Sequence, residues 1–449
     1  MILDGSISRA TAEARRMGCF GHILNLVTQA FLYGENTAAS ALQYEEIRST
    51  SLVRVEYRLR YGIEGQGANA KSGLGLVINA QRGFVLVSRA IVPNSCCNIQ
   101  VTVADSAVLP ASVKCLHPWH HWAIICYGAN LVRVPVKSAK LITEDISQGQ
   151  KITFVGCDGR GEIVEASTSV TKIIAHGLEP LCLRTARLIN IDKIEVEAAL
   201  NNECNTGFPI ATDATVQGVW IAPESACLDN HRFGIDSQEI AAIAVKVSQG
   251  VDISFWRLPL ELQSVKITEV EAMGVSTEWI NKVLDERSDR RTSTAKRTWS
   301  QMPHQFQVGD ILLSLNGKLV TRPSDLNITD PEEVYDVVAS REGNEITVRA
   351  SSTPEHDLET TRLTTFSGLV VHKPHRTMWQ FIDKLPSEIW VANIYLGSPA
   401  HWYGVPSMCF IIYLDGKPVS CITSLLSVIS QIPNNKGMFC AIAFLDTTT

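Results

Sequence analysis

The sequence predicts a mainly β protein, in which two β-barrels are followed by two small α+β domains. Between residues 51 and 250, short β-branched runs recur and are separated by turns, a spacing typical of barrels and sandwiches. Farther along, the segment LNGKLV at 315–320 returns as LDGKPV at 414–419. Each copy follows an apolar run, and Asn-Gly and Asp-Gly tolerate the positive φ of a tight hairpin. The near-repeat therefore predicts two sibling domains, each built around a β-hairpin.

Length sets the limits of the domain organisation. At 449 residues the chain has room for about three domains of roughly 150 residues each. We expect an amino-terminal segment of unclear role at 1–50 and the barrel pair at 51–250, with its strands near 52–57, 75–78, 84–87, 123–127, 152–156 and 216–222. The two α+β domains are expected at 257–350 and 363–449.

Charge and cysteine content argue against several classes of function. The net charge is −6 and no long basic stripe occurs, so we expect no nucleic-acid partner. No apolar run approaches the roughly 20 residues that cross a bilayer, so we expect no membrane partner. The twelve cysteines are scattered and form no CxxC pair, which favours reduced thiols over disulfides or a zinc site. We expect no cofactor.

Helices are predicted after each hairpin. In the first copy, Asp330-Pro331 supplies a helix start, and the apolar face would come from Val334, Val337 and Val338. In the second, one helix face is formed by Ile422, Leu425, Leu426 and Ile429, at spacings i, i+3, i+4 and i+7. The polar stretches 285–300 and 350–362 predict a loop and an interdomain linker, both open to proteolysis.

Several segments resemble one protease family. The stretch VGDILLSLNG at 308–317 resembles the PDZ domains of HtrA-type serine proteases. The stretches KSGLGLVI at 71–78 and GFVLVSRAIVP at 83–93 resemble the opening of a trypsin-like HtrA protease domain. With VKSAKL at 136–141 and MGVSTEWI at 273–280, they resemble the carboxy-terminal half of the fungal nuclear HtrA-like pro-apoptotic serine proteases.

This resemblance covers roughly residues 46–449 and implies a trypsin-like double β-barrel followed by two PDZ-like domains. The family's amino-terminal half, which holds the working serine endopeptidase, lies outside the resemblance. The family also implies a role in apoptosis and location in the nucleus, for which the basic pairs at 290–291 and 296–297 are a candidate import signal. A homo-oligomer is compatible with it.

The triad positions of the trypsin-like region are changed. Such a triad runs in the order His, Asp, Ser, and each member has a separate role. The position of the general base holds Ala90, whose methyl group cannot accept a proton. His121 stands where the orienting carboxylate belongs, and Thr206 stands in place of the nucleophile. Cys204 replaces the glycine whose N–H helps to form the oxyanion hole. The resemblance thus implies a non-catalytic, degenerate region in which no triad is intact.

Two alternative sites remain open at this stage. A self-sufficient hydrolase would use Cys204 or Thr206 as a displaced nucleophile, with His120 or His121 as its base. The histidines at 117, 120 and 121 would bind a metal if a further ligand were nearby. Lacking a carboxylate or Cys at ligand spacing, we expect no metal and interpret them as partly exposed loop histidines.

Peptide binding is the ligand chemistry that the sequence favours most. PDZ-like domains add an extended peptide as a further strand, and loop N–H groups hold its terminal carboxylate. The stretch FSGLVV at 366–371 resembles such a loop and strand. Our candidate residues are Ser367, Gly368, Leu369, Val370, Leu425 and Ile429, and the expected partners are carboxy-terminal or extended protein segments. The alternative is a groove closed by its own chain. In the first domain, acids within 267–274 would repel a carboxylate.

Overall fold

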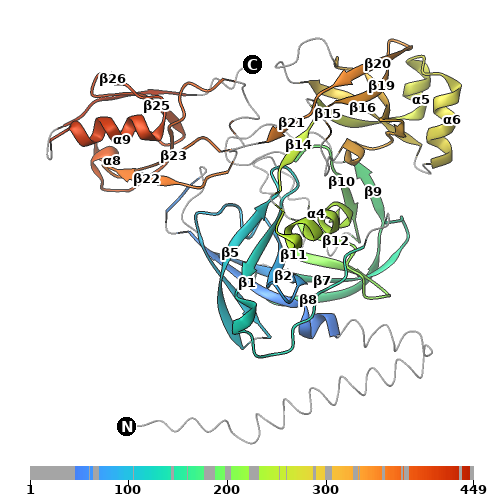
Figure 1. Ribbon diagram of the computed structural model, residues 1–449, viewed down its shortest axis with the longest axis horizontal. Coiled ribbons are helices and arrows are strands. Elements are labelled where there is room, and N and C mark those ends of the chain that lie inside the picture. The colour runs from blue at the N-terminus through green and yellow to red at the C-terminus, as the bar shows by residue number, and fades with distance from the viewer. Residues whose placement is uncertain are drawn as a thin grey trace, which may run out of the picture.

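The computed structural model describes residues 46–444 apart from several gaps (Figure 1). The gaps are 60, 64–69, 105, 143–145, 159, 176–187, 198–203, 222–231, 252, 259, 287–289, 299–305, 327–331, 333, 356–358, 376–377, 379–383 and 434–436. Almost all of the expected amino-terminal segment, 1–50, therefore lies outside the described residues.

Six antiparallel strands close the first barrel in the order β1-β2-β3-β6-β5-β4. They are β1 (Leu52–Arg58), β2 (Ala70–Asn79), β3 (Phe84–Ser88), β4 (Asn98–Val103), β5 (Ala107–Leu116) and β6 (Trp122–Tyr127). Buried and exposed side chains alternate along β1, as expected of a strand whose one face points into a barrel filled by side chains. Val53, Val55 and Tyr57 are buried, whereas Arg54 and Arg58 between and beyond them are exposed.

A second sheet follows, in the order β8-β7-β11-β12-β13-β10-β9. Its strands are β7 (Lys151–Asp158), β8 (Ile163–Ser169), β9 (Lys172–Ala175), β10 (Asp192–Glu195), β11 (Cys204–Ala211), β12 (Gly218–Ile221) and β13 (Phe233–Asp236). Helix α4 (Gln238–Gln249) comes next and ends at Gly250, whose φ of 78° is the left-handed helix stop.

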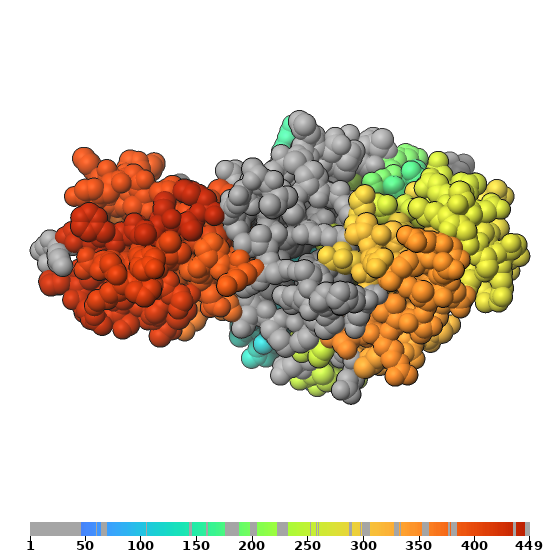
Figure 2. Space-filling view, turned by 90° about the horizontal axis from the view of Figure 1, so that it is seen from above, coloured from blue at the N-terminus to red at the C-terminus, as the bar shows by residue number. Residues whose placement is uncertain are grey.

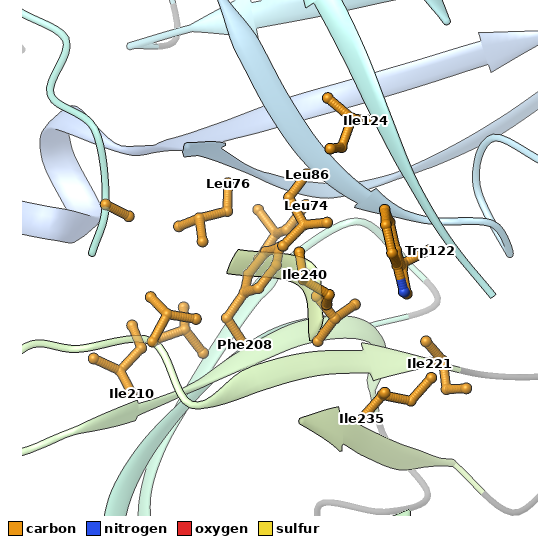
Figure 3. Close-up of a cluster of buried hydrophobic side chains, with 14 of the residues drawn as sticks. Leu74, Leu76, Leu86, Trp122, Ile124, Phe208, Ile210, Ile221, Ile235 and Ile240 are labelled. Carbon is orange, nitrogen blue, oxygen red and sulfur yellow. The ribbon is translucent and has the colours of Figure 1, made fainter. Parts of the chain in front are cut away.

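The barrel and the second sheet share one apolar core (Figure 3). Figure 3 shows side chains from both layers meeting there: Leu74, Leu76, Leu86, Trp122 and Ile124 from the barrel, Phe208, Ile210, Ile221 and Ile235 from the second sheet, and Ile240 from α4. Burial of each such side chain contributes about 1.5–3 kcal/mol. The seam between the two layers is therefore firmly packed.

The first carboxy-terminal domain has the strand order β15-β16-β17-β19-β20, with β18 paired to β17. Its elements are β15 (Leu260–Lys266), α5 (Ile267–Ala272), α6 (Thr277–Glu286), β16 (Arg291–Thr298), β17 (Ile311–Leu315), β18 (Lys318–Leu319), the 3-10 helix η2 (Pro323–Leu326), β19 (Tyr335–Arg341) and β20 (Asn344–Ala350). Strand β14 (Phe255–Arg257) before it pairs with β21 (Thr353–Glu355) after it, so both connections of the domain meet.

The second carboxy-terminal domain has the order β22-β23-β24-β25-β26, with β27 also paired to β25. Its elements are β22 (Leu363–Phe366), β23 (Leu369–His372), β24 (Trp390–Ile394), α8 (Pro399–Trp402), β25 (Cys409–Leu414), β26 (Lys417–Pro418), α9 (Ile422–Gln431) and β27 (Cys440–Ala443). Figure 2 shows the two carboxy-terminal domains at opposite ends of one face. No helix among the described residues has the length and apolarity needed to cross a membrane.

The predicted fold class is confirmed. Strands dominate, the first barrel is closed, and two small α+β units follow (Figure 1). Both predicted hairpins form, and their turn residues have positive φ: 48° and 79° at Asn316 and Gly317, 49° and 75° at Asp415 and Gly416. The predicted helix around Leu425 is α9.

Two predicted elements of the first domain are wrong. The segment expected to continue as a helix through Val338 is strand β19 from Tyr335 onward. Its valines pair with β17 and β20, and β-branched side chains favour that setting. The stretch 285–300, expected to be a loop, contains the end of α6 and all of β16. Thr292, Ser293 and Thr294 of this strand are buried, so polarity alone misled the prediction.

The expected linker 350–362 also differs from the prediction. Residues 353–355 form β21, and Thr360 is buried. The stretch joins the two carboxy-terminal domains, and its cleavage by proteases stays a prediction.

Candidate functional site

The residues that the sequence analysis assigns to the triad, Ala90, His121 and Thr206, lie on segments that contact one another at the seam between the first barrel and the second sheet. Ala90 sits in the turn after β3, where the Arg89 N–H donates to the His121 carbonyl oxygen at 2.7 Å. Thr206 lies on β11, and its hydroxyl oxygen accepts from the Leu74 N–H at 3.1 Å. A Cβ atom added to Gly73 would lie 2.8 Å from both the Thr206 hydroxyl oxygen and Ile91. The chain thus brings these segments together, and the surroundings of Gly73 beside Thr206 are tightly packed.

Thr206 is in no position to act as a nucleophile. Only 1% of it is exposed, and its hydroxyl is held by a backbone N–H. Ala90 has no group that could take a proton from it. Activation of a hydroxyl near neutral pH needs such a base. His121 is buried and does not stand at the position of Ala90, so it does not replace the missing general base. Changing Thr206 alone would not supply a base either.

The oxyanion turn is replaced by strand. Cys204 and Thr206 belong to β11 and pair with β7, where Cys204 faces Asp158 and Thr206 faces Cys157, with a bulge between them. An oxyanion hole needs N–H groups that converge on a point in the cleft. Here the surroundings of Cys204 are instead the packed core that it shares with Phe154 and Trp220. Its thiol is fully buried, so the alternative in which Cys204 attacks a substrate finds no support in this geometry.

Glu239, which the sequence analysis missed, joins the histidines before β6. Its Oε1 lies 3.3 Å from His117 Nε2, and its Oε2 lies 2.7 Å from His120 Nδ1. The two imidazoles stack with centroids 4.2 Å apart. His117, His120 and His121 are all buried, which corrects the expectation of partly exposed loop histidines. The available signal was the position of Glu239 in the first turn of α4, where a carboxylate is favoured.

Hydrogen bonds fix the protons of this cluster. His117 Nδ1 accepts from the Trp119 and His120 N–H groups at 3.2 and 2.9 Å, so its proton is on Nε2 and points at Glu239. His120 faces acceptors on both sides, Glu239 2.7 Å from Nδ1 and the Ile189 carbonyl oxygen 3.2 Å from Nε2.

The charges of the cluster follow from its burial and its pairing. Burial lowers the pKa of His117 to about 4. Burial alone would raise the pKa of Glu239, but the neighbouring His120 and His117 outweigh it and hold the pKa well below the usual range. The result is a half-buried Glu239 carboxylate held by two buried histidines, which ties the first barrel to α4.

The same three side chains have the composition of a metal site. Their ligand atoms lie within 4.8 Å of one another. A metal bound to Nε2 of His117 would require the proton to move to Nδ1, where two N–H donors already point. The hydrogen bonds therefore account for the cluster, and we assign it a structural role.

Arg89 is a second site residue that the sequence analysis missed. Its guanidinium is buried and donates to both carboxylate oxygens of Glu359, at 2.7 and 2.8 Å. It also donates to the carbonyl oxygens of His117 and Pro93. Bidentate pairs of this kind are strong and directional. The connection between the carboxy-terminal domains is thus fastened beside Ala90.

The candidate peptide-binding residues lie in a hairpin and a packed core. Ser367 and Gly368, with φ of 50° and 90°, form the two-residue turn between β22 and β23. Their carbonyl oxygens accept from the Ala400 and Tyr395 N–H groups, at 2.9 and 2.8 Å. Leu369 and Val370 are buried on β23, which pairs with β22 on one side and β24 on the other.

The helix residues proposed as groove walls are likewise used within the domain. Leu425 is fully buried, and Ile429 packs against the same core, as does Phe366 of β22. Both edges of β23 are already paired, with β22 and β24, so a bound peptide cannot add to β23 unless β22 is displaced. The geometry matches the alternative in which the chain closes its own groove. In the first domain, the segment 267–274, whose acids were expected to repel a carboxylate, forms helix α5 and the turn after it.

Comparison with known proteins gives consistent relatives. A pro-apoptotic serine protease of Neosartorya fischeri is 37% identical over 399 residues, which are 86% of this chain and 39% of that protein. Those of Chaetomium globosum and Pyricularia oryzae are 35% and 34% identical, over 86% and 90% of this chain and 39% and 40% of theirs. The chain spans about two-fifths of the length of these relatives. No protein-family model matches it.

Solved structures show more distant similarity. The HtrA-type protease AlgW with a tripeptide has 14% identity and a TM-score of 0.47, covering 70% of this chain and 97% of that chain. A serine endoprotease from Yersinia pestis has 15% identity and a TM-score of 0.42, with the same coverage.

Proposed function

This chain belongs to the HtrA-type family of fungal pro-apoptotic serine proteases, and we propose that it is a non-catalytic part of that family. In this proposal it binds extended protein segments or partner subunits and regulates a catalytic domain. The observation that carries the proposal is the state of the triad positions. Ala90 provides no base, and the Thr206 hydroxyl is buried against the Leu74 N–H. Proteolysis in apoptosis would then be the task of a catalytic domain outside this chain.

A direct test uses two probes of serine protease chemistry on the full chain. We expect no labelling by a fluorophosphonate, which reports activated serines, and no cleavage of unfolded casein, with trypsin as the positive control. The variant T206S should behave like the parent because the base is still missing. Labelling of the parent would contradict the proposal, and its loss in T206A or C204A would identify the nucleophile.

A stronger test attempts to rebuild the triad. The triple variant A90H/H121D/T206S restores the three residue types. We expect it to remain inactive, because Cys204 and the residue at 206 would still lie on a paired strand without an oxyanion hole. Casein cleavage by this variant would show that the cleft is less degenerate than we propose, while an inactive but folded variant supports the proposal.

The proposal includes location in the nucleus, and this part rests only on the relation to the family. The basic pair that includes Arg291 is a poor import signal, since Arg291 begins strand β16 and its guanidinium donates to the Ser264 hydroxyl at 2.7 Å. Imaging of the tagged chain in fungal cells tests the location. Alanine substitution at Arg290 and Arg291 should not change it.

A further inference from the structure

Strand β15 lies at the edge of its sheet, yet part of that edge is occupied. In the order β15-β16-β17-β19-β20, one side of β15 has no neighbouring strand among the described residues. The side chain of Asn190, from the loop before β10, lies there. Its Nδ2 donates to the Leu260 carbonyl oxygen at 3.1 Å, and its Oδ1 accepts from the Leu262 N–H at 2.9 Å.

These two contacts replace the hydrogen bonds of a missing strand. A carboxamide carries the donor and the acceptor of a peptide unit, so it can satisfy an edge in the way that an added strand does. Leu260 and Leu262 flank one residue, and their outward C=O and N–H are the pair that a neighbouring strand would use. Asn190 therefore resembles one residue of a bound peptide.

The loop before β10 of the second sheet places Asn190 beside β15. Its neighbours Leu188, Ile189 and Ile191 are at most 4% exposed and anchor the loop in the barrel. Its own φ of 50° is left-handed, a conformation that asparagine tolerates better than most residues. The Asn190 amide is thus directed at β15 by a loop whose neighbouring side chains are buried.

A second contact lies close by. The Ser324 hydroxyl of η2 donates to Asp192 Oδ2 at 2.6 Å, and the Arg322 guanidinium lies 3.8 Å from the same oxygen. Helix η2 also packs against β15. Asn190 therefore contacts β15 while Asp192 contacts the region of η2, beside a cavity of about 590 Å³ that Asp192 and Arg322 help to line. We call these contacts the Asn190–Asp192 clasp.

The equivalent edge of the second domain is also covered. The strand order β23-β24-β25 of the second domain corresponds to β15-β16-β17 of the first. In the second domain β25 also pairs with β26 and β27, just as β17 in the first domain also pairs with β18 and β19. The outer side of β23 is taken by β22, joined to it through the turn at Ser367 and Gly368. One edge is covered by a local hairpin and the other by a residue about 70 positions away.

We infer that Asn190 is an intramolecular occupant of the β15 edge, and that an extended polypeptide pairs with β15 only after the Asn190–Asp192 clasp opens. The inference deepens the proposed function, because it names where an extended segment binds and what controls its access. The clasp joins barrel and domain by a few polar contacts, whereas β22 is part of the folded second domain. The first domain is therefore the one whose edge can be released without unfolding.

The test removes the amide without disturbing the loop. In N190G, glycine adopts the positive φ of this position freely, so the change is confined to the side chain. The matched control is A104G, at a residue with φ of 48° in the turn between β4 and β5. Both variants are compared with the parent as full chains. The first readout is hydrogen exchange of the Leu262 amide, and the second is the fluorescence anisotropy of labelled, unfolded casein.

We expect exchange at Leu262 to rise about tenfold in N190G and casein affinity to rise severalfold, with A104G like the parent. Unchanged exchange at Leu262 would overturn the inference, since the amide would then not depend on Asn190. Faster exchange without stronger casein binding would overturn the claim that the edge accepts a strand. Neither result depends on fluorophosphonate labelling, so a failure here is distinguishable from a failure of the proposed function.

Discussion

The two carboxy-terminal domains repeat one strand order but cover their edge strands differently. Strand β23 is paired by β22, its neighbour along the chain, whereas β15 is met by Asn190 of the barrel. The second domain also has the ten-residue helix α9 where the first has the four-residue η2. The second domain is thus complete in itself, and the first depends on its contact with the barrel. A near-repeat in sequence does not imply an equal degree of independence.

The largest effect is expected from the turn that completes the second domain. A Cβ atom on Gly368 would lie 2.0 Å from the Ser398 side chain, and its φ is 90°. We expect G368A to lower the free energy of unfolding of this domain by about 3 kcal/mol or more. In G416A, a matched positive-φ glycine with open space around it, the loss should be about 1 kcal/mol. Urea unfolding of both variants measures the difference, and equal losses would contradict the close packing.

The connection between the two domains should be the next most sensitive feature. E359Q leaves the buried Arg89 guanidinium without its charged partner, which costs about 3 kcal/mol. The exposed Glu388 provides a control, E388Q, for which we expect almost no change. Mild proteolysis gives a second readout. Cleavage near residues 356–362 should appear in E359Q well before it appears in the parent, and equal cleavage rates would show that the pair does not fasten this segment.

Acid should affect the second domain more than the first. Burial lowers the pKa of His372 on β23 to about 4, and no histidine lies among the described residues of 260–350. The unfolded chain takes up this proton near pH 6.5, whereas the folded chain does so only near pH 4. Stability is therefore full above about pH 6.5 and falls by about 3 kcal/mol between there and pH 4.

Domain-specific tryptophans can follow this acid effect, with Trp390 reporting on the second domain and Trp279 on the first. The variant H372Q should flatten the pH dependence of the Trp390 transition between pH 6.5 and 4. If both transitions shift equally with pH in the parent, His372 is not the cause.

The smallest effect that we expect is a difference in stability between substitutions in the two hairpin turns. Asn316 donates to Glu332 Oε2 at 3.0 Å and accepts from the Asp336 N–H at 2.8 Å, so N316D loses one donor. We expect a loss of about 0.5–1 kcal/mol. The reciprocal change D415N in the second domain should be nearly neutral, because both residue types tolerate the turn conformation. Thermal unfolding of the two variants checks the order, and a larger loss in D415N would reverse our comparison of the turns.

Much of the fold could be predicted from local sequence. The hairpins followed from Asn-Gly and Asp-Gly, and α9 followed from its apolar spacing, because both signals act within a few residues. Strands β16 and β19 were missed because pairing with neighbouring strands, which are distant in sequence, determines that these segments are extended. Val337 suits a helix face or a strand equally well until β17 and β20 lie beside it.

For the site, the sequence by itself determined which chemical groups are missing. Ala90 cannot be a base in any fold, and its assignment to the position of the general base rests on the family resemblance. Only the tertiary structure decided what the remaining groups contact. Arg89 meets Glu359, His120 meets Glu239, and Asn190 meets β15 across separations of 270, 119 and about 70 residues. Such contacts depend on how whole domains pack, and the pattern of side chains along any one segment carries no record of them.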